Sequence, residues 1–535
     1  MARRTQINNS GKQAVTARRP FIGAILLVTV ILYSGIFTNT ILYGWDDGEY
    51  MQSEDIREFR IGAFFSEYYL GMYQPLPVLT FAVNYAATGE NPAPYQTINL
   101  LLHLISTHLV FYLIISLTGR NDISAFIAFL FALHPMHVEA VAWISTRSNG
   151  LYSAFYLAAM IYYVRYKKES RNKYLIYCYI AFILSLFSKS MAITLPLILL
   201  LLDYFLSERI LKKDLLTKLP AFGLSVLFGI IAVDASSSFG HITNLQVDYN
   251  LSDRFFMISY ALAFYLGRAL IPVNLSAVYA YPAKTETGLL PAEYYLSFIL
   301  LIVIVFVLLR RRRFRKDNLF GLLFFLITIS VALPLFWSRM LMLADRYTYI
   351  PYIGLFFIMG SYLKTILSKE NRAVRRIRPA ILAVAGGLLI WYAATTAVRI
   401  GVWEDAATLT TDIIEKDRSD IDVSIGYFFR GNIRDRAGDP EGALRDYDRA
   451  IQLNPDYTLA YNNRGINKGI LGEFEPALAD FNKAIGLEPD YRDAYYNRGN
   501  VKYYLGWKQE ACLDWQKAAA LGSEQAEKIH RKYCN

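Results

Sequence analysis

Residues 21–50 read FIGAILLVTVILYSGIFTNTILYGWDDGEY, an uncharged apolar stretch followed at once by an acidic cluster. The apolar part, 21–43, is long enough to cross a bilayer as a helix. It is too long for the apolar region of a cleaved signal peptide, and no small-residue cleavage site follows it. We therefore expect a retained membrane anchor, with Asp46 and Asp47 where the chain leaves the membrane. Carboxylates at such a position are energetically costly, which indicates a function for them.

The composition excludes an ordinary soluble enzyme. Of the 535 residues, 54% are hydrophobic and only 19% are charged, which indicates a polytopic membrane protein. Residues 1–20 form a basic, polar tail, 21–398 are a succession of apolar runs, and 403–535 are polar. The positive charge is concentrated in short loops, so it reports on topology, and we expect no nucleic-acid partner.

Charge predicts the topology of the apolar region. The segments rich in Lys and Arg are 1–20, 165–173, 207–218, 310–317 and 364–378, which the positive-inside rule assigns to the cytoplasm. Eleven spans fit this rule, at 21–43, 95–117, 123–142, 150–164, 174–188, 190–206, 219–234, 294–309, 318–337, 347–363 and 379–398. One more apolar run, 254–270, would break the rule if it crossed, so we expect a re-entrant or interfacial helix there.

The C-terminal part contains an internal repeat. Three copies with a period of 34 begin at Gly426, Ala460 and Ala494, a period typical of tetratricopeptide (TPR) repeats. Residues 399–425 are expected to be a linker or degenerate half-repeat, and 426–535 three repeats with a capping helix, on the outer side. Two interpretations stay open for the recurring asparagines: they line the concave, peptide-binding surface, or they cross-brace neighbouring helices. These asparagines are Asn462, Asn463, Asn497 and Asn500.

The cysteines leave two alternatives. Cys178 lies in a predicted span, whereas Cys512 and Cys534 lie in the repeats. On the outer side the latter two could form a disulfide that holds the last helix on the array. Two free thiols are the other alternative.

Polar residues from five separate stretches are predicted at the outer membrane face. Besides Asp46 and Asp47 they are Glu49, His134, His137, Glu139, Arg147, Lys189, Asp345 and Arg346. Two histidines and a glutamate could suggest a metal site, but their spacing is not that of the zinc motif, and a hydrogen-bonded network at the helix end is the stronger interpretation. Asp345 and Arg346 could instead form only a local ion pair. Ionisable groups that gather on one membrane face indicate a functional site.

This combination suits glycosyl transfer from a lipid phosphate. Asp46 or Asp47 would act as the base for an acceptor hydroxyl, and Arg147, Lys189 and Arg346 would bind the donor phosphate as it leaves. Glu49, His134, His137, Glu139 and Asp345 would form a supporting polar network. A repeat array that holds the acceptor would raise its local concentration. The sequence neither requires nor identifies a metal cofactor.

The motifs also resemble a known family. Trp45-Asp46-Asp47, the stretch that begins at His134, Ser188-Lys189-Ser190 and the stretch Ala344–Pro351, followed by TPRs, resemble the transmembrane-and-TPR-containing O-mannosyltransferases and their bacterial relatives. The resemblance implies an all-α GT-C glycosyltransferase fold, a polyprenyl-phosphate-linked sugar such as mannose or another hexose, and transfer to Ser or Thr of an exported protein. The short array favours a bacterial inner-membrane protein. Asn149 stands where the family has an acidic residue, so the resemblance does not identify the sugar or the acceptor.

Two other functions stay open. One is a GT-C transferase that acts on a lipid or a cell-wall glycan, with the repeats recruiting partner enzymes. The other is a membrane-anchored TPR scaffold without enzymatic activity, which would tolerate the loss of Asp46 and Asp47.

Overall fold

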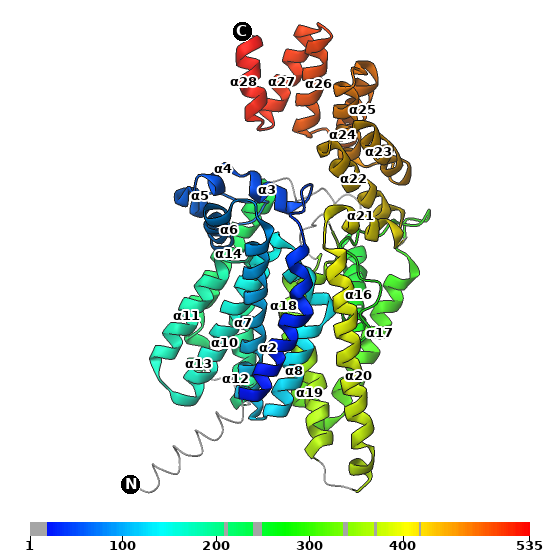
Figure 1. The fold of residues 1–535 in the computed structure, drawn as a ribbon. Helices are drawn as coiled ribbons and strands as arrows, with labels where there is room; N and C mark the ends of the chain where they lie inside the picture. Colours follow the sequence, from blue (N-terminus) through cyan, green and yellow to red (C-terminus); the bar gives the residue numbers. More distant parts are fainter. Residues whose placement is uncertain are drawn as a thin grey trace. The chain divides into compact units, whose positions relative to one another are not determined.

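The computed structural model describes residues 19–207, 212–238, 249–334, 341–368, 372–416 and 419–534. The described chain is helical and forms no β-strand beyond two isolated bridges, which confirms the all-α prediction. It forms two compact units (Figure 1). The first, called the membrane unit, comprises residues 1–42 and 46–405. The second, called the repeat unit, comprises residues 43–45 and 406–535.

The membrane unit is built from helices joined mostly by short connections. They are α2 (Arg19–Tyr33), α3 (Asp46–Gln52), α4 (Glu54–Arg57), α5 (Ile61–Ser66), α6 (Pro75–Thr88), α7 (Pro92–Thr118), α8 (Asn121–Leu133), α9 (Glu139–Ala142), α10 (Arg147–Glu169), α11 (Asn172–Leu186), α12 (Leu195–Ser207), α13 (Lys212–Leu216), α14 (Leu219–Ser238), α16 (Leu251–Arg268), α17 (Ala292–Arg310), α18 (Arg315–Ile329), α19 (Tyr352–Ser368) and α20 (Arg372–Val402).

Several of these helices suit a bilayer. Six stretches of the described chain are long and apolar enough to cross it, or up to seven if the bent pair α8 and Pro135–Ala142 counts as one span. The predicted number of eleven spans stays a prediction. Helix α16 is not among the six, and its Tyr260 stacks on Tyr294 in the first turn of α17. The re-entrant or interfacial assignment of 254–270 stays a prediction.

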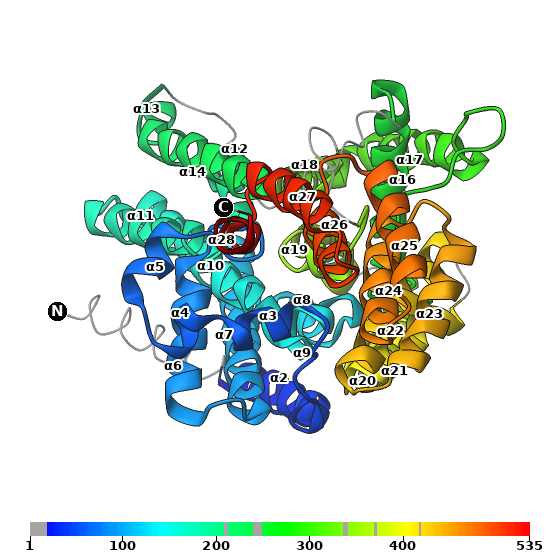
Figure 2. The same ribbon diagram turned by 90° about the horizontal axis from the view of Figure 1, so that it is seen from above.

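Helix α8 lies in the middle of the membrane unit. Seen from above, α2, α7, α19 and α20 surround it (Figure 2), and it contacts all four. Nearby, α18 and α19 cross at a pair of glycines. A Cβ added to Gly354 would lie 2.4 Å from the carbonyl oxygen of Gly321, so no larger residue fits at this crossing.

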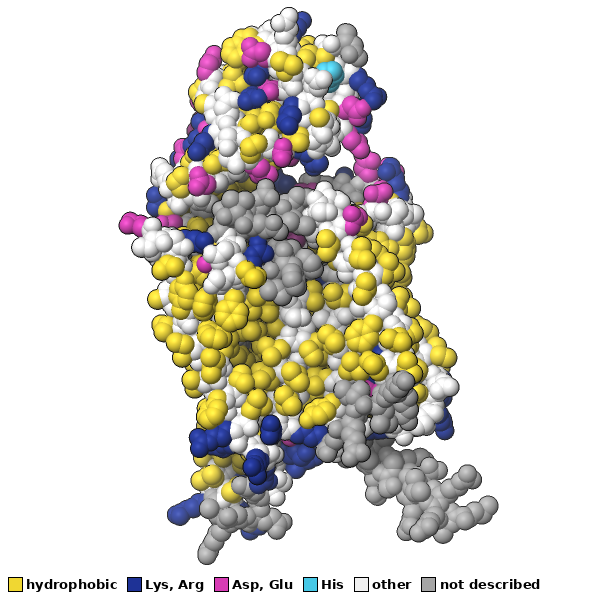
Figure 3. Space-filling model, turned by 180° about the vertical axis from the view of Figure 1, so that it is seen from behind, with side chains coloured by type: hydrophobic (Ala, Val, Ile, Leu, Met, Phe, Trp, Pro, Cys, Tyr) yellow, Lys and Arg dark blue, Asp and Glu magenta, His cyan; other side chains and the backbone are white. Residues whose placement is uncertain are grey.

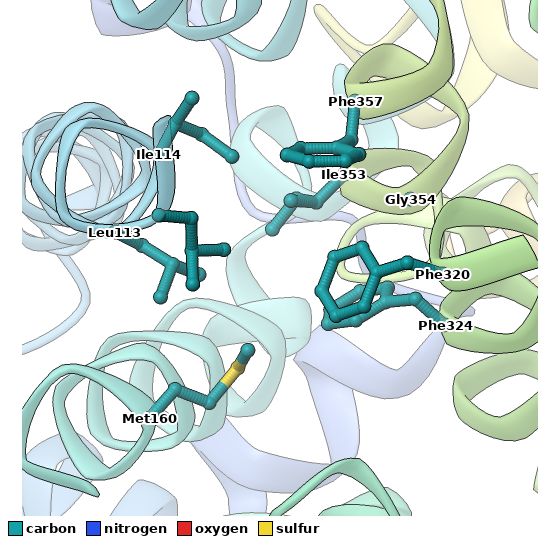
Figure 4. Close-up of a pocket in the computed structure, with 9 residues that line it drawn as sticks. Leu113, Ile114, Met160, Phe320, Phe324, Ile353, Gly354 and Phe357 are labelled. Atoms are coloured by element: carbon teal, nitrogen blue, oxygen red, sulfur yellow. The ribbon is translucent and has the colours of Figure 1, made fainter. Parts of the chain in front are cut away.

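A small apolar cavity adjoins this crossing (Figure 4). Side chains from α7, α10, α18 and α19 point into it, among them Met160, Phe320 and Phe357. It contains no polar lining residue, so it offers packing space and no chemistry.

Charged side chains mark one end of the membrane unit. On the face shown in Figure 3, hydrophobic side chains cover the unit, with Lys and Arg gathered below them. Two of the predicted basic segments are in contact, because Lys167 of 165–173 pairs with Asp214 of 207–218 at 2.8 Å. The side of the membrane that these segments face stays a prediction. The tail 1–18 lies outside the described residues.

The repeat unit consists of paired helices. They are α21 (Ala406–Glu415), α22 (Asp420–Arg436), α23 (Pro440–Leu453), α24 (Thr458–Ile470), α25 (Phe474–Leu487), α26 (Arg492–Tyr504), α27 (Lys508–Ala520) and α28 (Glu524–Tyr533). One position of the repeat must be glycine, since its Cβ would meet an aromatic ring of the paired helix. In the third repeat the added Cβ of Gly499 would lie 2.7 Å from Trp515, and Gly431 and Gly465 face Tyr447 and Phe481 in the same way.

The polar positions of the repeats brace the helices. Arg498 donates two hydrogen bonds to Asp514, at 2.9 and 2.6 Å, and the earlier repeats contain the same pair. The predicted asparagines form cross-links as well. Asn497 donates to Asn462 of the preceding repeat at 3.1 Å, Asn463 donates to Asn432, and Asn500 accepts from the Trp515 indole. The cross-bracing interpretation therefore describes the contacts, and a peptide-binding role stays a prediction.

The C-terminal cysteines form a disulfide. Cys512 of α27 is bonded to Cys534, which follows α28. Of the two alternatives for these cysteines, the structure shows the bonded one, and it holds the last helix on the array. Cys178 is a free, buried thiol in α11.

Candidate functional site

The segment Glu139–Asn149 is the centre of the candidate site. It consists of the short helix α9, the 3₁₀ turn η3 (Ile144–Thr146) and the first turn of α10. It exists because α8 ends at Leu133, where Pro135 lacks the N–H that would continue the helix. The chain then bends by 57° and runs through short turns, whose carbonyl groups need hydrogen-bond donors from elsewhere.

Two buried amides of α7 supply those donors. Gln96 donates to the carbonyl of Ala142 at 2.9 Å, and Asn99 donates to the carbonyl of Trp143 at 3.1 Å. Both side chains are almost completely buried. They lie three positions apart, on one face of α7. They therefore fix the path of the segment that holds the site.

Asp47 joins the first outer loop to this segment. Its carboxylate accepts hydrogen bonds from the backbone N–H groups of Leu42, at 3.1 Å, and Ser145, at 2.8 Å. The side chain is fully buried. Burial raises the pKa of Asp47 to about 7, although the two backbone N–H groups lower it. Asp47 thus links the chain at Leu42 to the turn η3, and its catalytic role stays a prediction.

Asp46 has a different environment. It is half-buried at the start of α3, and it contributes to the electrostatic environment of Arg346. Helix α3 is fixed in turn by Tyr50, whose ring stacks on Phe81 of α6 with 4.7 Å between the ring centroids. Of the two predicted acids, Asp46 is the one that reaches solvent, and Asp47 is buried.

Arg346 is held by Glu139. Both Glu139 carboxylate oxygens accept from it, one from the guanidinium and the other from its backbone N–H at 2.9 Å. The Glu139 side chain is 1% exposed and that of Arg346 is 19% exposed. Burial lowers the pKa of Arg346, but the carboxylates of Glu139 and Asp46 outweigh burial and hold it above its ordinary value. Arg346 thus stays charged and partly accessible beside Asp46.

Asp345 faces another partner. Its carboxylate accepts from the Tyr279 hydroxyl at 2.7 Å and is buried. The guanidinium of Arg346 forms its ion pair with Glu139, which is 207 positions away. Asp345 and Glu139 therefore contact residues that are far away in the sequence. A local ion pair between Asp345 and Arg346 does not describe these contacts.

Arg147, for which phosphate binding stays a prediction, lies inside the membrane unit. It is fully buried, stacks on the ring of Phe81 at 4.3 Å and donates to Asn84 at 2.7 Å and to Asn99 at 3.2 Å. With its donors directed at helices α6 and α7, Arg147 braces the start of α10. The sequence contained a signal for these partners, since Asn84 and Asn99 are amides within apolar stretches.

Lys189 reaches the same segment from another side. It lies between α11 and the turn η4 (Ser190–Thr194). Its ammonium donates to the side-chain oxygen of Asn149, in the first turn of α10, at 2.6 Å. Lys189 is half-buried, whereas Asn149 is completely buried. Lys189 is thus the second cation of the site that reaches the surface.

The two histidines are used within the fold. His137 bonds to the carbonyl of Phe131 at 2.8 Å, and His134 accepts from the backbone of Met136 at 3.2 Å. Glu139 is directed at Arg346, and the described residues contain no cluster of three His, Cys, Asp or Glu side chains able to hold a metal. Glu49 is exposed. The hydrogen-bonded network at the end of α8 is the arrangement that these contacts form.

Comparisons with known proteins identify the repeats and a set of relatives. A family model for the tetratricopeptide repeat matches residues 424–457, and a second model for the TPR repeat matches 470–506. The chain is 25% identical over 404 residues to protein O-mannosyl-transferase F38B6.6 of Caenorhabditis elegans, which covers 72% of this chain and 54% of the worm protein. It is 38% identical over 95 residues to protein O-mannosyl-transferase TMTC3 of Homo sapiens, covering 18% of this chain and 10% of the human protein.

Two solved structures of TPR domains are also similar to this chain. The first TPR of Spaghetti (RPAP3) and the Arabidopsis OM64 TPR domain are 24% and 25% identical to this chain. Each covers 22% of this chain with a TM-score of 0.21, and the match covers 94% and 97% of those structures.

Proposed function

We propose that this protein is a membrane glycosyltransferase of the GT-C type that moves a sugar from a polyprenyl-phosphate donor to a Ser or Thr hydroxyl of a protein. The observation that carries the proposal is that half-buried Asp46 contributes to the electrostatic environment of Arg346, which is bound by Glu139. A carboxylate beside a fixed, partly exposed cation is suited to activate an acceptor and to neutralise a leaving phosphate. The likeness to protein O-mannosyl-transferases supports it.

In this mechanism Asp46 is the base and Asp47 is the anchor. Asp46 takes the proton of the acceptor hydroxyl while the acceptor oxygen forms a bond to the anomeric carbon of the sugar. The bond between that carbon and the phosphate oxygen breaks, and the electron pair leaves with the polyprenyl phosphate. Arg346 and Lys189 stabilise the phosphate through charge-assisted hydrogen bonds. Asp47 fixes the loop through the N–H groups of Leu42 and Ser145.

The remaining parts follow from this assignment. The lipid tail of the donor lies in the bilayer beside the membrane unit, and the repeats hold the acceptor protein. The site and the repeats face the outside of a bacterial cell membrane, so the acceptors are exported proteins. The basic end of the membrane unit then faces the cytoplasm.

The decisive experiment is a transfer assay with the full chain in lipid nanodiscs. A synthetic mannosyl-phosphoryl polyprenol, with other hexoses as alternatives, is offered with Ser- and Thr-containing peptides, and products are read by mass. Asp46→Asn should abolish transfer without changing insertion. The matched control is Glu54→Gln in the same loop, an acid whose side chain is 78% exposed, which should keep full activity.

Other outcomes would identify the rival functions. Sugar transfer to a lipid or to a cell-wall glycan, with none to peptides, would replace the protein acceptor by that substrate. If Asp46→Asn cells keep the function while deletion of 406–535 abolishes it, the protein is a membrane-anchored scaffold and not a transferase.

A further inference from the structure

We propose that the buried side chain of Asn149 is a ligand of the donor phosphate and works together with Lys189. This inference rests on the proposed function and deepens it, because it adds a residue that the chemistry alone does not require. Asn149 would donate one hydrogen bond from its amide nitrogen to a non-bridging oxygen of the phosphate. Lys189 would supply the charge.

The orientation of the Asn149 amide is set by its neighbour. An ammonium group only donates, so the side-chain atom that faces Lys189 at 2.6 Å has to be the oxygen. The amide nitrogen must then point away from that contact. The oxygen and nitrogen atoms of an asparagine side chain are usually hard to tell apart, but the contact with Lys189 distinguishes them here.

That amide nitrogen has no hydrogen-bond partner among the described residues. Asn149 is 0% exposed, so water does not readily replace a partner. A buried donor left unsatisfied costs free energy comparable to a lost hydrogen bond. Such a group persists where a ligand completes it. The donor type specifies the ligand, since an amide N–H requires an acceptor oxygen or nitrogen.

The surroundings favour an anionic acceptor. Asn149 lies in the first turn of α10, a helix of 23 residues whose first turn contains no acidic residue and whose N-cap Thr146 makes no side-chain capping bond. The first N–H groups of a helix lack intrahelical partners and attract anions. Lys189 adds a formal positive charge on the accessible side. The anion already present, Asp47, is committed to backbone N–H groups.

The segment Glu139–Asn149 connects the Asn149–Lys189 contact to the loop of the proposed base, Asp46. Asn149 follows Ser145, whose N–H binds Asp47, the chain neighbour of Asp46. A phosphate held by Asn149 and Lys189 would therefore be bound by the structure that positions the acceptor-activating loop.

The test measures phosphate binding apart from sugar transfer. Full-length protein in detergent is titrated with farnesyl phosphate, with farnesol and with inorganic phosphate, and the ligand-induced shift of the unfolding temperature yields Kd. We expect Asn149→Ala and Lys189→Gln to weaken farnesyl phosphate binding at least tenfold, the effect of losing a hydrogen bond to a charged group. Farnesol binding should not change. Lys173→Gln, an exposed lysine at the basic end, should bind like the wild type.

Several outcomes would overturn the inference. If Asn149→Ala folds and binds farnesyl phosphate as the wild type does, Asn149 is no ligand, and the transferase function stands. If Asn149→Ala does not fold, Asn149→Leu, which also lacks the amide donor, replaces it, with at least a fivefold weaker Kd expected. If wild type binds inorganic phosphate as tightly as farnesyl phosphate, the site is one for free anions. If wild type binds neither phosphate yet transfers sugar, only this inference fails; if it also transfers no sugar, the proposed function fails as well.

Discussion

Replacing Glu139 should release Arg346, and the structure allows the cost to be worked out. Glu139 is the acceptor for both the guanidinium and the backbone N–H of Arg346. With the Glu139 side chain 1% exposed and Arg346 19% exposed, the pair is closer to a buried ion pair than to a surface one. Removing one partner of a buried pair costs roughly 3–5 kcal/mol, whereas exposed pairs contribute about 0–1 kcal/mol.

The partial exposure of Arg346 sets the expected value. Since water still reaches the guanidinium, we expect Glu139→Ala to lower the free energy of unfolding by about 3 kcal/mol, the low end of the buried range. Glu139→Gln keeps an oxygen that accepts from the backbone N–H, so it should cost about 1–2 kcal/mol. The double variant Glu139→Gln/Arg346→Gln leaves no buried charge, and the coupling energy of the cycle should be about 2 kcal/mol.

The chain provides its own probe for this measurement. Cys178 is buried in α11, while Cys512 and Cys534 are bonded to each other. A thiol-reactive dye therefore labels Cys178 when the membrane unit opens, and labelling along an SDS titration gives the free energy of unfolding. Additive single substitutions, with a coupling energy near zero, would refute the role assigned to the Glu139–Arg346 pair. Unchanged sugar transfer by Glu139→Gln would refute the orientation of Arg346 as a requirement for catalysis.

Three further predictions concern other parts of the chain. Burial raises the pKa of Asp47 to about 7 from 3.8, so the contribution of this raised pKa to stability is complete below pH 3.8 and is lost as the pH rises through 7. The unfolding temperature of Asp47→Asn, read by tryptophan fluorescence, should therefore approach or exceed that of the wild type as the pH rises from 5 to 8. A difference that stays constant over this range would contradict the prediction. Gly354→Val should lower the free energy of unfolding by about 3 kcal/mol, because its Cβ meets a backbone carbonyl of α18. The control Gly386→Val, whose added Cβ has nothing within 4 Å, should keep the wild-type yield of folded protein. Equal yields for the two variants would show that α18 and α19 can separate. Reduction of Cys512–Cys534, which closes a loop with a sequence separation of 22, should destabilise the repeat unit by about 3 kcal/mol, measured by its urea midpoint, and an unchanged midpoint would contradict the expected role of the disulfide.

Periodic features could be predicted from the sequence because they are local. An apolar run such as 21–43 is long enough to span a bilayer whatever surrounds it, and a period of 34 identifies TPR repeats through spacing alone. The glycine of that period, Gly499 in the third repeat, is required by the ring of Trp515, 16 positions later in the same repeat. Because such patterns recur along the chain, one sequence is enough to identify the apolar runs and the repeats.

The partners within the candidate site depended on the tertiary structure. From the amino-acid sequence we predicted an all-helical protein with apolar helices, a repeat array and a set of charged residues at one membrane face. It did not distinguish Asp46 from Asp47, because adjacent acids differ only in what the fold places against them. Asp47 is buried and accepts from the N–H of Ser145, 98 positions away, whereas Asp46 is half-buried in the electrostatic environment of Arg346. Likewise Arg147 and Lys189 are both cations in the sequence, but Arg147 is buried between helices, whereas Lys189 is half-buried and donates to Asn149. Desolvation and hydrogen bonding are properties of the folded surroundings, and these decide which charge is structural and which can meet a ligand.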